Sequence, residues 1–497
     1  MNGPLYIAVD LGAGSGRVFL ASFDADEFFL EEVHRFHYPP YSDGQFIRWN
    51  FRKIFDEIEA GLSFAAAKAN ERPISSIGVD SWGVDYGLVG VDGELVADPV
   101  CYRDSRTDEM MARVFATVPR DEIFDKTGIQ FQKFNTLYQL MSETEAGSML
   151  LLLPDLINYF LTGKAVTEYT NATTTQMVNA GTLDWDSDLI ERLGLDRNLL
   201  QEIVPAGTRL GELLPEISSS TGLRDISVIT PGTHDTASAV AAAPLNPGSA
   251  YISSGTWSLI GIERDAPLIT REASSLNFTN EGGVFGTIRF LKNVMGLWIF
   301  ESCRKEWASA GETVDYESLI RDAESIDGFP GFIFPDDERF LNPSSMLEAI
   351  DTQLAETGQH AGRDPAMLTK VIFDSLAFRY GSVLRSIESL TGEKLARVEI
   401  VGGGGRNRYL NQATSNASGL PVRSGLTEAT VVGNVVVQAI SSGRFESLSE
   451  ARAYVASKIE CEEFIPKAVD GLADAEAGYL AVEERFTAPI AHAGEGK

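Results

Sequence analysis

The sequence is poor in cysteine, with three among 497 residues. Cys101, Cys303 and Cys461 are far apart in the chain, and their number is odd. Small disulfide-bonded domains carry even sets of closely spaced cysteines, so the sequence does not fit that class. It indicates instead a protein of the reducing cytoplasm with free thiols.

Motifs for a zinc site and for a membrane span are also missing. The five histidines form no HExxH or HxxxH pair, which argues against the common helical zinc motifs. No apolar run approaches the ~20 residues that a helix needs to cross a bilayer. The segment 149–163 comes nearest, but Pro154 and Asp155 interrupt it. The first residues show no signal for secretion, so we expect a cytoplasmic protein with no membrane partner.

Positive charge is scarce, because 41 lysines and arginines stand against 71 aspartates and glutamates. The formal net charge at pH 7 is −30. Nucleic acids and anionic membranes bind basic surfaces, so neither is an expected partner. We interpret the acidity as a solvated surface that aids solubility, with adaptation to salt as the alternative. The composition leaves open whether the protein is a monomer or a homodimer.

Strand-like and helix-like segments alternate along the chain, which predicts the α/β class. Residues 6–24 predict two strands around a glycine turn, and residues 50–70 carry apolar side chains at helical spacing. Residues 248–263 and 395–407 predict further strands. A helix predicted at 365–392 begins with proline and ends near glycine, as helices tend to do.

The length exceeds what one hydrophobic core holds, so two domains are expected. Proline, glycine and small residues at 241–249 predict the boundary between them. We therefore expect an N-terminal domain at 1–244 and a C-terminal domain at 245–480. The small and polar residues at 481–497 predict a disordered tail.

The segment YIAVDLGAGSGRVFLASFD, residues 6–24, resembles half of a dinucleotide fingerprint. The glycines are spaced GxGxG, however, and a predicted strand follows them, so no helix N-terminus would face a pyrophosphate. The chain also has no GxxxxGK[ST] motif. Backbone N–H groups of such a turn can bind an anion, and Arg17 would add charge. Asp10 at the strand end is placed to hold Mg²⁺ through water; a purely structural hairpin is the alternative.

Three later segments favour a phosphate site. PGTHDTASAV (231–240) places an aspartate at a strand end before a small-residue helix, where a lone aspartate is more often an N-cap. YISSGTWSL (251–259) places Thr256 in a second turn between strands. VEIVGGGGRN (398–407) has four consecutive glycines, which predict that a flat or charged group approaches the backbone closely.

These motifs, in this order, resemble the FGGY carbohydrate kinases of the actin/hexokinase-like ATPases. More specific stretches that carry the resemblance are SWGVDYGL, YRDSRT, TNATTTQ, TNEGG and FLKNVMGLW. The resemblance implies an α/β fold of two actin/hexokinase-like (ribonuclease H-like) domains with a catalytic cleft between them. It also implies phosphorylation of a ketose by Mg²⁺–ATP, with L-rhamnulose as the leading substrate. L-fuculose and a xylulose are the alternatives.

The resemblance assigns roles to individual residues. Asp235 matches the catalytic base, and Asp10 is assigned to the metal. Sugar contacts are implied for Gly83, His234, Asp235, Thr236 and Asn293. Nucleotide contacts are implied for Ala13, Gly14, Ser15, Gly16, Arg17, Thr256, Gly403 and Glu301. The sugar is expected mainly on the N-terminal domain and ATP mainly on the C-terminal domain.

Three places depart from the family pattern, and one of them is Gly405-Arg406, where bulkier residues are common beside the purine. Gly14 stands where a second serine is usual, and Glu301 stands where a glutamine is expected. Both put the strength of ATP binding in question. A non-catalytic sugar or nucleotide sensor of the same fold is one alternative function, but it predicts loss of Asp235. A dinucleotide-dependent oxidoreductase is another, and the strand predicted after the glycine turn disfavours it.

Overall fold

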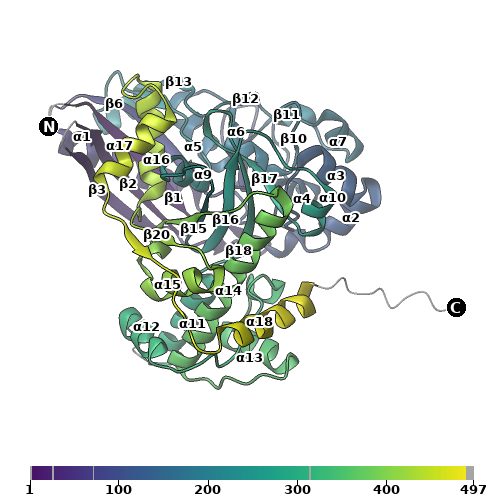
Figure 1. Cartoon of the computed structure of the whole chain (residues 1–497). Coiled ribbons are helices and arrows are strands. Elements are labelled where there is room, and N and C mark those ends of the chain that lie inside the picture. The colour runs from purple at the N-terminus through teal and green to yellow at the C-terminus, as the bar shows by residue number, and fades with distance from the viewer. Residues whose placement is uncertain (1–2, 25–26, 71, 313–314, 488–497) are drawn as a thin grey trace. The chain divides into compact units, whose positions relative to one another are not determined.

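A computed structural model describes residues 3–24, 27–70, 72–312 and 315–487. The chain forms two compact units (Figure 1). Unit 1 comprises Met1–Asn246, Gly261–Lys292 and Glu428–Glu460, and unit 2 comprises the rest. The units are therefore not two continuous halves, whereas the sequence predicts a single division at 244–245. Which unit binds the sugar and which binds ATP stays a prediction.

A six-stranded sheet forms the centre of unit 1. Its strands, in spatial order, are β13 (Arg209–Glu212), β14 (Ser227–Ile229), β6 (Ile74–Ser81), β1 (Leu5–Gly12), β2 (Ser15–Phe23) and β3 (Phe28–His37). β1 is antiparallel to β2 and parallel to β6. The glycine turn predicted at 6–24 is therefore a hairpin between two strands, and no helix follows it.

Helices α1 (Phe51–Ala69), α9 (Asp235–Ala242) and α16 (Ala429–Ser441) cover this sheet and position the site. α1 packs on β2 and β3. Asn50 is its N-cap, and Oδ1 of Asn50 accepts from the N–H of Lys53. α16 packs on β1, β6 and α9. A Cβ at Gly433 would lie 1.6 Å from the carbonyl oxygen of Ser238, so only glycine lets α16 approach α9 this closely.

Unit 1 contains further helices and strands. The helices are α2 (Met110–Thr117), α3 (Arg120–Thr127), α4 (Thr136–Met141), α5 (Leu153–Thr162), α6 (Tyr169–Ala172), α7 (Ser187–Arg192), α8 (Pro215–Thr221), α10 (Arg271–Ser275) and α17 (Leu448–Lys458). Three of its further strands are β7 (Tyr86–Val89), β9 (Thr167–Glu168) and β17 (Thr279–Gly282). β7 pairs with β8 (Met149–Leu152).

Unit 2 also contains strands of a sheet. In spatial order these strands are β15 (Ser249–Ser254), β19 (Arg397–Val401), β20 (Val422–Ser424) and β21 (Glu462–Phe464). The first three are parallel. Its helices are α11 (Trp298–Ser309), α12 (Tyr316–Glu324), α13 (Met346–Glu356), α14 (Pro365–Thr391), α15 (Arg408–Ser418) and α18 (Leu472–Thr487). α14 ends at Gly392, which has the left-handed backbone conformation of a helix C-cap. Strands β16 (Trp257–Arg264) and β18 (Ile288–Met295) have residues in both units.

The C-terminal segment differs from the sequence prediction. Residues 481–487 belong to α18, so a disordered tail does not begin at 481. Tyr479 and Val482 are buried, so this helix has a packed apolar face. The small and polar residues that follow the helix led to the prediction of a tail from 481 onward. The residues 488–497 of the predicted tail lie outside the described residues.

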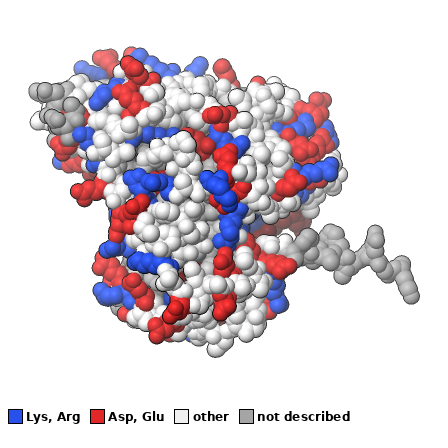
Figure 2. Space-filling view, viewed as in Figure 1, with Lys and Arg blue, Asp and Glu red and all other residues white. Residues whose placement is uncertain are grey.

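Two further findings concern membranes and charge. None of the helices in the described part of the chain has the length and apolar character that a membrane span requires. On the face shown in Figure 2, acidic and basic side chains are interspersed, and no continuous basic surface is visible there.

Candidate active site

The turn of the β1–β2 hairpin is held by one buried tyrosine. The hydroxyl of Tyr38 donates to the carbonyl oxygens of Gly12 at 2.6 Å and Ser15 at 3.0 Å. Gly14 has φ +144°, a conformation that disfavours every residue with a side chain. Gly16 is needed for packing, because a Cβ there would lie 2.3 Å from the ring of Phe36. The turn is thus a fixed scaffold whose residue 13 is exposed.

The side chain of Arg17, at the end of this turn, is paired with two carboxylates of unit 1. Its guanidinium donates to Oδ2 of Asp10 at 2.5 Å and to Oε2 of Glu428 at 2.5 Å. Two acidic partners offset the positive charge that Arg17 would bring to a phosphate. A direct nucleotide contact by Arg17 stays a prediction.

Asp10 also has an acidic neighbour that the sequence analysis missed. Asp80 on β6 stands in register with Asp10 on β1. Burial raises the pKa of both groups, and the neighbouring charge of Asp10 raises the pKa of Asp80 further, to well above its ordinary value. Of the two carboxyl groups, Asp80 therefore has the stronger tendency to hold a proton.

The surroundings of this pair decide whether it fits a divalent cation. Oδ2 of Asp80 accepts from the side-chain amide of Asn434 at 2.6 Å, whereas its buried Oδ1 has no hydrogen-bond partner in the part of the chain that is described. The described residues contain no cluster of three or more acidic, histidine or cysteine side chains suited to a metal. Mg²⁺ commonly binds one or two protein carboxylates and completes its octahedron with water and phosphate. The pair fits that donor set.

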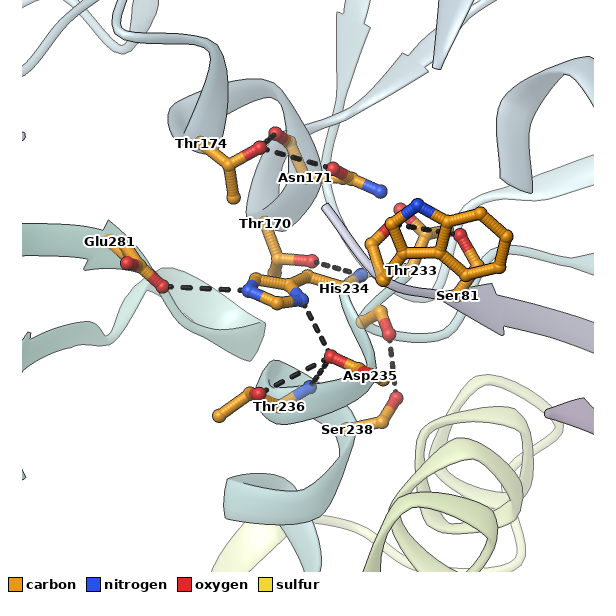
Figure 3. Close-up of polar contacts among 12 residues, drawn as sticks. Ser81, Thr170, Asn171, Thr174, Thr233, His234, Asp235, Thr236, Ser238 and Glu281 are labelled. Atoms are coloured by element: carbon orange, nitrogen blue, oxygen red, sulfur yellow. Dashed lines mark hydrogen bonds and ion pairs between the residues drawn. The ribbon is translucent and has the colours of Figure 1, made fainter. Parts of the chain in front are cut away.

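Asp235, the predicted base, begins α9, and all its contacts fall on one carboxylate oxygen (Figure 3). Oδ1 accepts from the N–H of Thr236 at 2.6 Å and from its hydroxyl at 3.2 Å. Nδ1 of His234 lies 2.8 Å from the same oxygen. No contact from the described residues falls on Oδ2. The side chain is 31% exposed, so Oδ2 is free to meet a substrate hydroxyl.

The segment before Asp235 is fixed by a buried glutamate. Oε2 of Glu168 accepts from the N–H and the hydroxyl of Thr233, both at 2.9 Å, and from the hydroxyl of Thr170 at 2.5 Å. The hydroxyl of Thr170 in turn accepts from the N–H of His234 at 3.2 Å. The N–H of Ser81 donates to the carbonyl oxygen of Thr233 at 2.9 Å, which ties this segment to the end of β6.

The other end of His234 meets a second buried glutamate. Nε2 of His234 lies 3.6 Å from Oε2 of Glu281 on β17 (Figure 3). The same oxygen lies 3.1 Å from the guanidinium of Arg289 on β18, whose side chain is fully buried. Glu281 belongs to the motif TNEGG, but nothing in the sequence marks it as a neighbour of His234.

The loop after β6 carries Gly83 and a strained neighbour. A Cβ at Gly83 would lie 3.1 Å from both Cγ2 and Oγ1 of Thr174, which is tighter than most real contacts. Val84 has φ +69°, a strained conformation for a β-branched residue. The hydroxyl of Thr174 accepts from the N–H of Val84, and the hydroxyl of Thr136 donates to its carbonyl oxygen at 2.7 Å. Strain held in place in this way is typical of functional sites.

Asp85 anchors the aromatic side chains of this loop. Its Oδ2 accepts from the indole N–H groups of Trp49 at 2.7 Å and Trp82 at 2.9 Å, and its Oδ1 accepts from the amide of Gln139 at 3.1 Å. Burial raises the pKa of Asp85 to about 6 despite these donors. Trp82 is buried.

In unit 2, the turn with Thr256 and the glycine cluster lie beside each other. The carbonyl oxygen of Thr256 accepts from the N–H groups of Gly296 and Trp298 at 3.1 and 3.2 Å, and its side chain is exposed. A Cβ at Gly402 would lie 2.9 Å from the carbonyl oxygen of Ser254, and one at Gly404 would lie 2.0 Å from its Oγ.

The expectation that a bound group explains all four glycines is therefore wrong for two of them. Gly402 and Gly404 are required by packing against the end of β15 in the same chain. Gly403 differs, because it is exposed and a Cβ there would meet nothing within 4 Å. Gly403 is thus the one of these three that is open to a nucleotide.

Glu301 and Asn293 also lie in unit 2. The carboxylate of Glu301 on α11 is paired with Arg304 one turn later, at 2.9 and 3.0 Å. This pairing offsets the negative charge that made Glu301 unfavourable beside ATP. Asn293 lies on β18 and is half-buried.

The structure thus brings Asp10, Gly83, His234, Asp235 and Thr236 into unit 1, with the hairpin turn at 13–17. Thr256, Asn293, Glu301 and Gly403 belong to unit 2. Sequence reasoning missed Tyr38, Asp80, Glu168, Glu281 and Arg289. A weak signal existed for Asp80 alone, since it ends a buried strand just as Asp10 does.

Comparisons with known proteins show the family and the fold of the chain. The model of the N-terminal domain of the FGGY family of carbohydrate kinases matches residues 5–242, and that of the C-terminal domain matches residues 250–442. The solved structure of glycerol kinase from Plasmodium falciparum with ADP has a TM-score of 0.77 at 15% identity, covering 97% of this chain and 98% of that one. Xylulose kinase from Lactobacillus acidophilus has a TM-score of 0.76 at 16% identity and covers 97% of both chains.

Closer relatives are found among curated sequences. A rhamnulokinase from Bacteroides thetaiotaomicron is 42% identical over 470 residues, which cover 93% of this chain and 96% of the relative. A rhamnulokinase from Bacillus subtilis is 37% identical, with 94% and 96% covered. Neither the sensor nor the oxidoreductase alternative is favoured by these matches. The chain is a member of the FGGY family of carbohydrate kinases.

Proposed function

We propose that this protein transfers the γ-phosphoryl group of ATP to the 1-hydroxyl of L-rhamnulose and so forms L-rhamnulose 1-phosphate. The observation that carries the chemistry is the carboxylate of Asp235, whose Oδ1 is held by three contacts while Oδ2 is free. The choice of sugar is supported by relatives that are named rhamnulokinase and are 37–42% identical over nearly the whole chain.

In this mechanism Asp235 is the general base. Oδ2 accepts the proton of the sugar hydroxyl as that oxygen attacks the γ-phosphorus, and ADP leaves. Oδ1 stays bound to Thr236 and beside His234, so the carboxylate does not rotate away from the hydroxyl. A base held in one orientation avoids part of the entropy cost of reaching the reactive geometry.

The sugar contacts are proposed for His234, Thr236 and Gly83 in unit 1 and for Asn293 in unit 2. The absence of a side chain at Gly83 leaves room for the ketose beside Thr174. An amide such as Asn293 both donates to and accepts from hydroxyl groups. Loss of a single such contact is expected to change sugar preference, so related ketoses are the substrates to compare.

The nucleotide contacts are proposed for the turn at 13–17 and for Thr256, Gly403 and Glu301. Backbone N–H groups of the two turns bind the phosphates, and the open surface at Gly403 receives the purine or ribose. The carboxylates of Asp10 and Asp80 would hold Mg²⁺, which supplies positive charge to the phosphates during transfer.

A coupled assay of ADP formation tests this function. The purified protein is supplied with Mg²⁺–ATP and, in turn, L-rhamnulose, L-fuculose, L-xylulose, D-xylulose, L-ribulose and glycerol. We expect the highest kcat/KM with L-rhamnulose, and ³¹P NMR to find the product phosphate on O1. The Asp235→Asn protein, purified in the same way, controls for contaminating kinases. A higher kcat/KM with another ketose would correct the substrate, and no activity on any ketose would overturn the proposal.

A further inference from the structure

We propose that Glu281, held by Arg289, is a positioning residue that aims the imidazole of His234 at Oδ1 of Asp235. The inference rests on the proposed function only in taking Asp235 as the base. Glu281 does not touch the catalytic carboxylate. It acts through His234, whose two ring nitrogens face Glu281 and Asp235 (Figure 3).

The backbone of His234 is already fixed before the ring is considered. Its N–H donates to Thr170, and the preceding Thr233 is bound by Glu168. The freedom that remains is rotation of the imidazole about its side-chain bonds. Nδ1 lies 2.8 Å from Asp235 and Nε2 lies 3.6 Å from Glu281, so carboxylates on both sides determine the ring orientation.

The two contacts of the ring are electrostatic. Nδ1 of His234 has no hydrogen bond from the described residues, although it lies 2.8 Å from Oδ1 of Asp235. Nε2 lies 3.6 Å from Oε2 of Glu281, which is longer than a hydrogen bond. Removal of the Glu281 carboxylate should therefore change the electrostatic environment of the ring, which the ¹⁵N signals of its nitrogens report.

Glu281 and Arg289 form a buried ion pair, and burial of both charges costs desolvation free energy. Its side chain is 6% exposed and that of Arg289 is 0% exposed. Nε of Arg289 donates to the carbonyl oxygen of Gly282 at 3.0 Å, which orients the guanidinium toward Oε2 of Glu281. A buried ion pair adds little net stability, because desolvation of both charges offsets their attraction. Apolar residues of similar size would fill this space at least as well, so the pair points to a functional requirement.

The consequence for catalysis follows from the contacts on Asp235. If the ring of His234 turns away, Oδ1 keeps only the two contacts from Thr236, and the carboxylate can rotate. Oδ2 then no longer lies in one position relative to the sugar hydroxyl. Misplacement of a reacting group by about 1 Å costs about 100-fold in rate.

The test replaces both buried charges together, because loss of one partner alone leaves an unpaired buried charge. In E281L/R289M the carboxylate that faces His234 is gone while the volume is nearly kept. E281Q keeps the shape of the side chain and an acceptor oxygen. Because E281Q leaves Arg289 without its charged partner, its melting temperature is compared with that of the double variant. The control is E263L/R452M, which removes another glutamate–arginine pair of unit 1, joined at 2.8 Å and not in contact with His234.

We expect kcat with L-rhamnulose to fall about 10- to 100-fold in E281L/R289M, with KM for ATP unchanged. E281Q should lose less, and the control should keep wild-type kcat. The ¹⁵N signals of the His234 ring, identified by their loss in His234→Asn, should shift in ligand-free E281L/R289M and not in the control. Thermal melting confirms that each variant is folded.

Wild-type kcat in folded E281L/R289M overturns the proposal, and so do His234 signals that do not shift. An equal loss of kcat in the control overturns it too, because the effect would then come from general destabilisation. If the wild-type enzyme phosphorylates no ketose, the proposed function fails. The NMR measurement still decides whether Glu281 positions His234.

Discussion

Asp10 on β1 and Asp80 on β6 stand opposite each other in the register of two parallel strands, and both are buried. Two neighbouring carboxyl groups that are buried do not both ionise easily. Burial and the charge of Asp10 together raise the pKa of Asp80 well above its ordinary value. A divalent cation at the pair would compete with protons for the two carboxylates. The pair would therefore act as a proton-linked cation site.

The first prediction concerns this linkage. Because protons and Mg²⁺ compete for Asp80, the Mg²⁺ concentration needed for half-maximal rate should fall as the pH rises. In Asp80→Asn we expect that concentration to rise about tenfold and to lose much of its pH dependence. Asp92→Asn, on the exposed turn after β7, is the control and should behave as wild type. Equal pH dependence in Asp80→Asn and wild type would contradict the assignment.

The second prediction separates chemistry from nucleotide binding. Asn at 235 can still accept from Thr236 through its amide oxygen, but it cannot accept the sugar proton. Asp235→Asn should therefore abolish ADP formation with L-rhamnulose, while calorimetry detects ATP binding of wild-type affinity. Asp225→Asn is a suitable control, because Asp225 is exposed with φ +56°, a conformation that asparagine tolerates. Wild-type turnover in Asp235→Asn would show that another group is the base.

Much of the fold was predictable because its signals are local. The hairpin at β1 and β2 follows from β-rich residues on both sides of a glycine turn, and α1 follows from apolar side chains at helical spacing. α14 was predicted to one residue, since Pro365 and Gly392 mark its ends. The packed end of α18 was missed, because its apolar face depends on where neighbouring helices lie.

The site was predictable only where a residue belongs to a recognisable motif. Asp10, Asp235 and Thr256 were proposed in this way, and their roles stay predictions. Asp80, Glu168 and Glu281 were missed because their partners are distant in sequence and meet them only through strand register or packing. Likewise, four glycines in a row did not reveal that Gly402 and Gly404 are needed to pack against Ser254.

The third prediction addresses the space beside the sugar. A methyl group at Gly83 would press on Thr174, at 3.1 Å from its Cγ2. We expect Gly83→Ala to raise KM for L-rhamnulose several-fold while KM for ATP is unchanged. Adding Thr174→Ser removes that methyl and keeps the hydroxyl that accepts from Val84, so it should restore part of the sugar affinity. An unchanged KM in Gly83→Ala would place the sugar elsewhere.

The fourth prediction concerns the missing serine of the phosphate turn. At Gly14 there is space for a side chain, since a Cβ would meet nothing within 4 Å, but φ is +144°. The backbone, rather than crowding, thus opposes a serine. Gly14→Ser should lower stability by about 1 kcal/mol and should not tighten ATP binding. Gly14→Ala, which adds the strain without a hydroxyl, is the matched control. Tighter ATP binding by the serine variant alone would show that the hydroxyl outweighs the strain.

The fifth prediction follows from the raised pKa of Asp85, which is about 6 in the folded protein against an ordinary value of 3.8. The folded state holds this proton more tightly than the unfolded state does. The contribution of Asp85 to the free energy of unfolding is therefore highest below about pH 4. It declines as the pH rises to about 6 and is constant above that, and the full decline amounts to about 3 kcal/mol.

Asp85→Asn removes this group and its decline while keeping an acceptor for Trp49 and Trp82. The melting temperature of wild type minus that of Asp85→Asn should thus fall between pH 4 and pH 6 and then level off. The difference between the two proteins matters here, because other carboxyl groups titrate in the same range and cancel in it. A difference that is constant from pH 4 to pH 7 would mean that Asp85 is ionised throughout, stabilised by the indole N–H groups that it accepts.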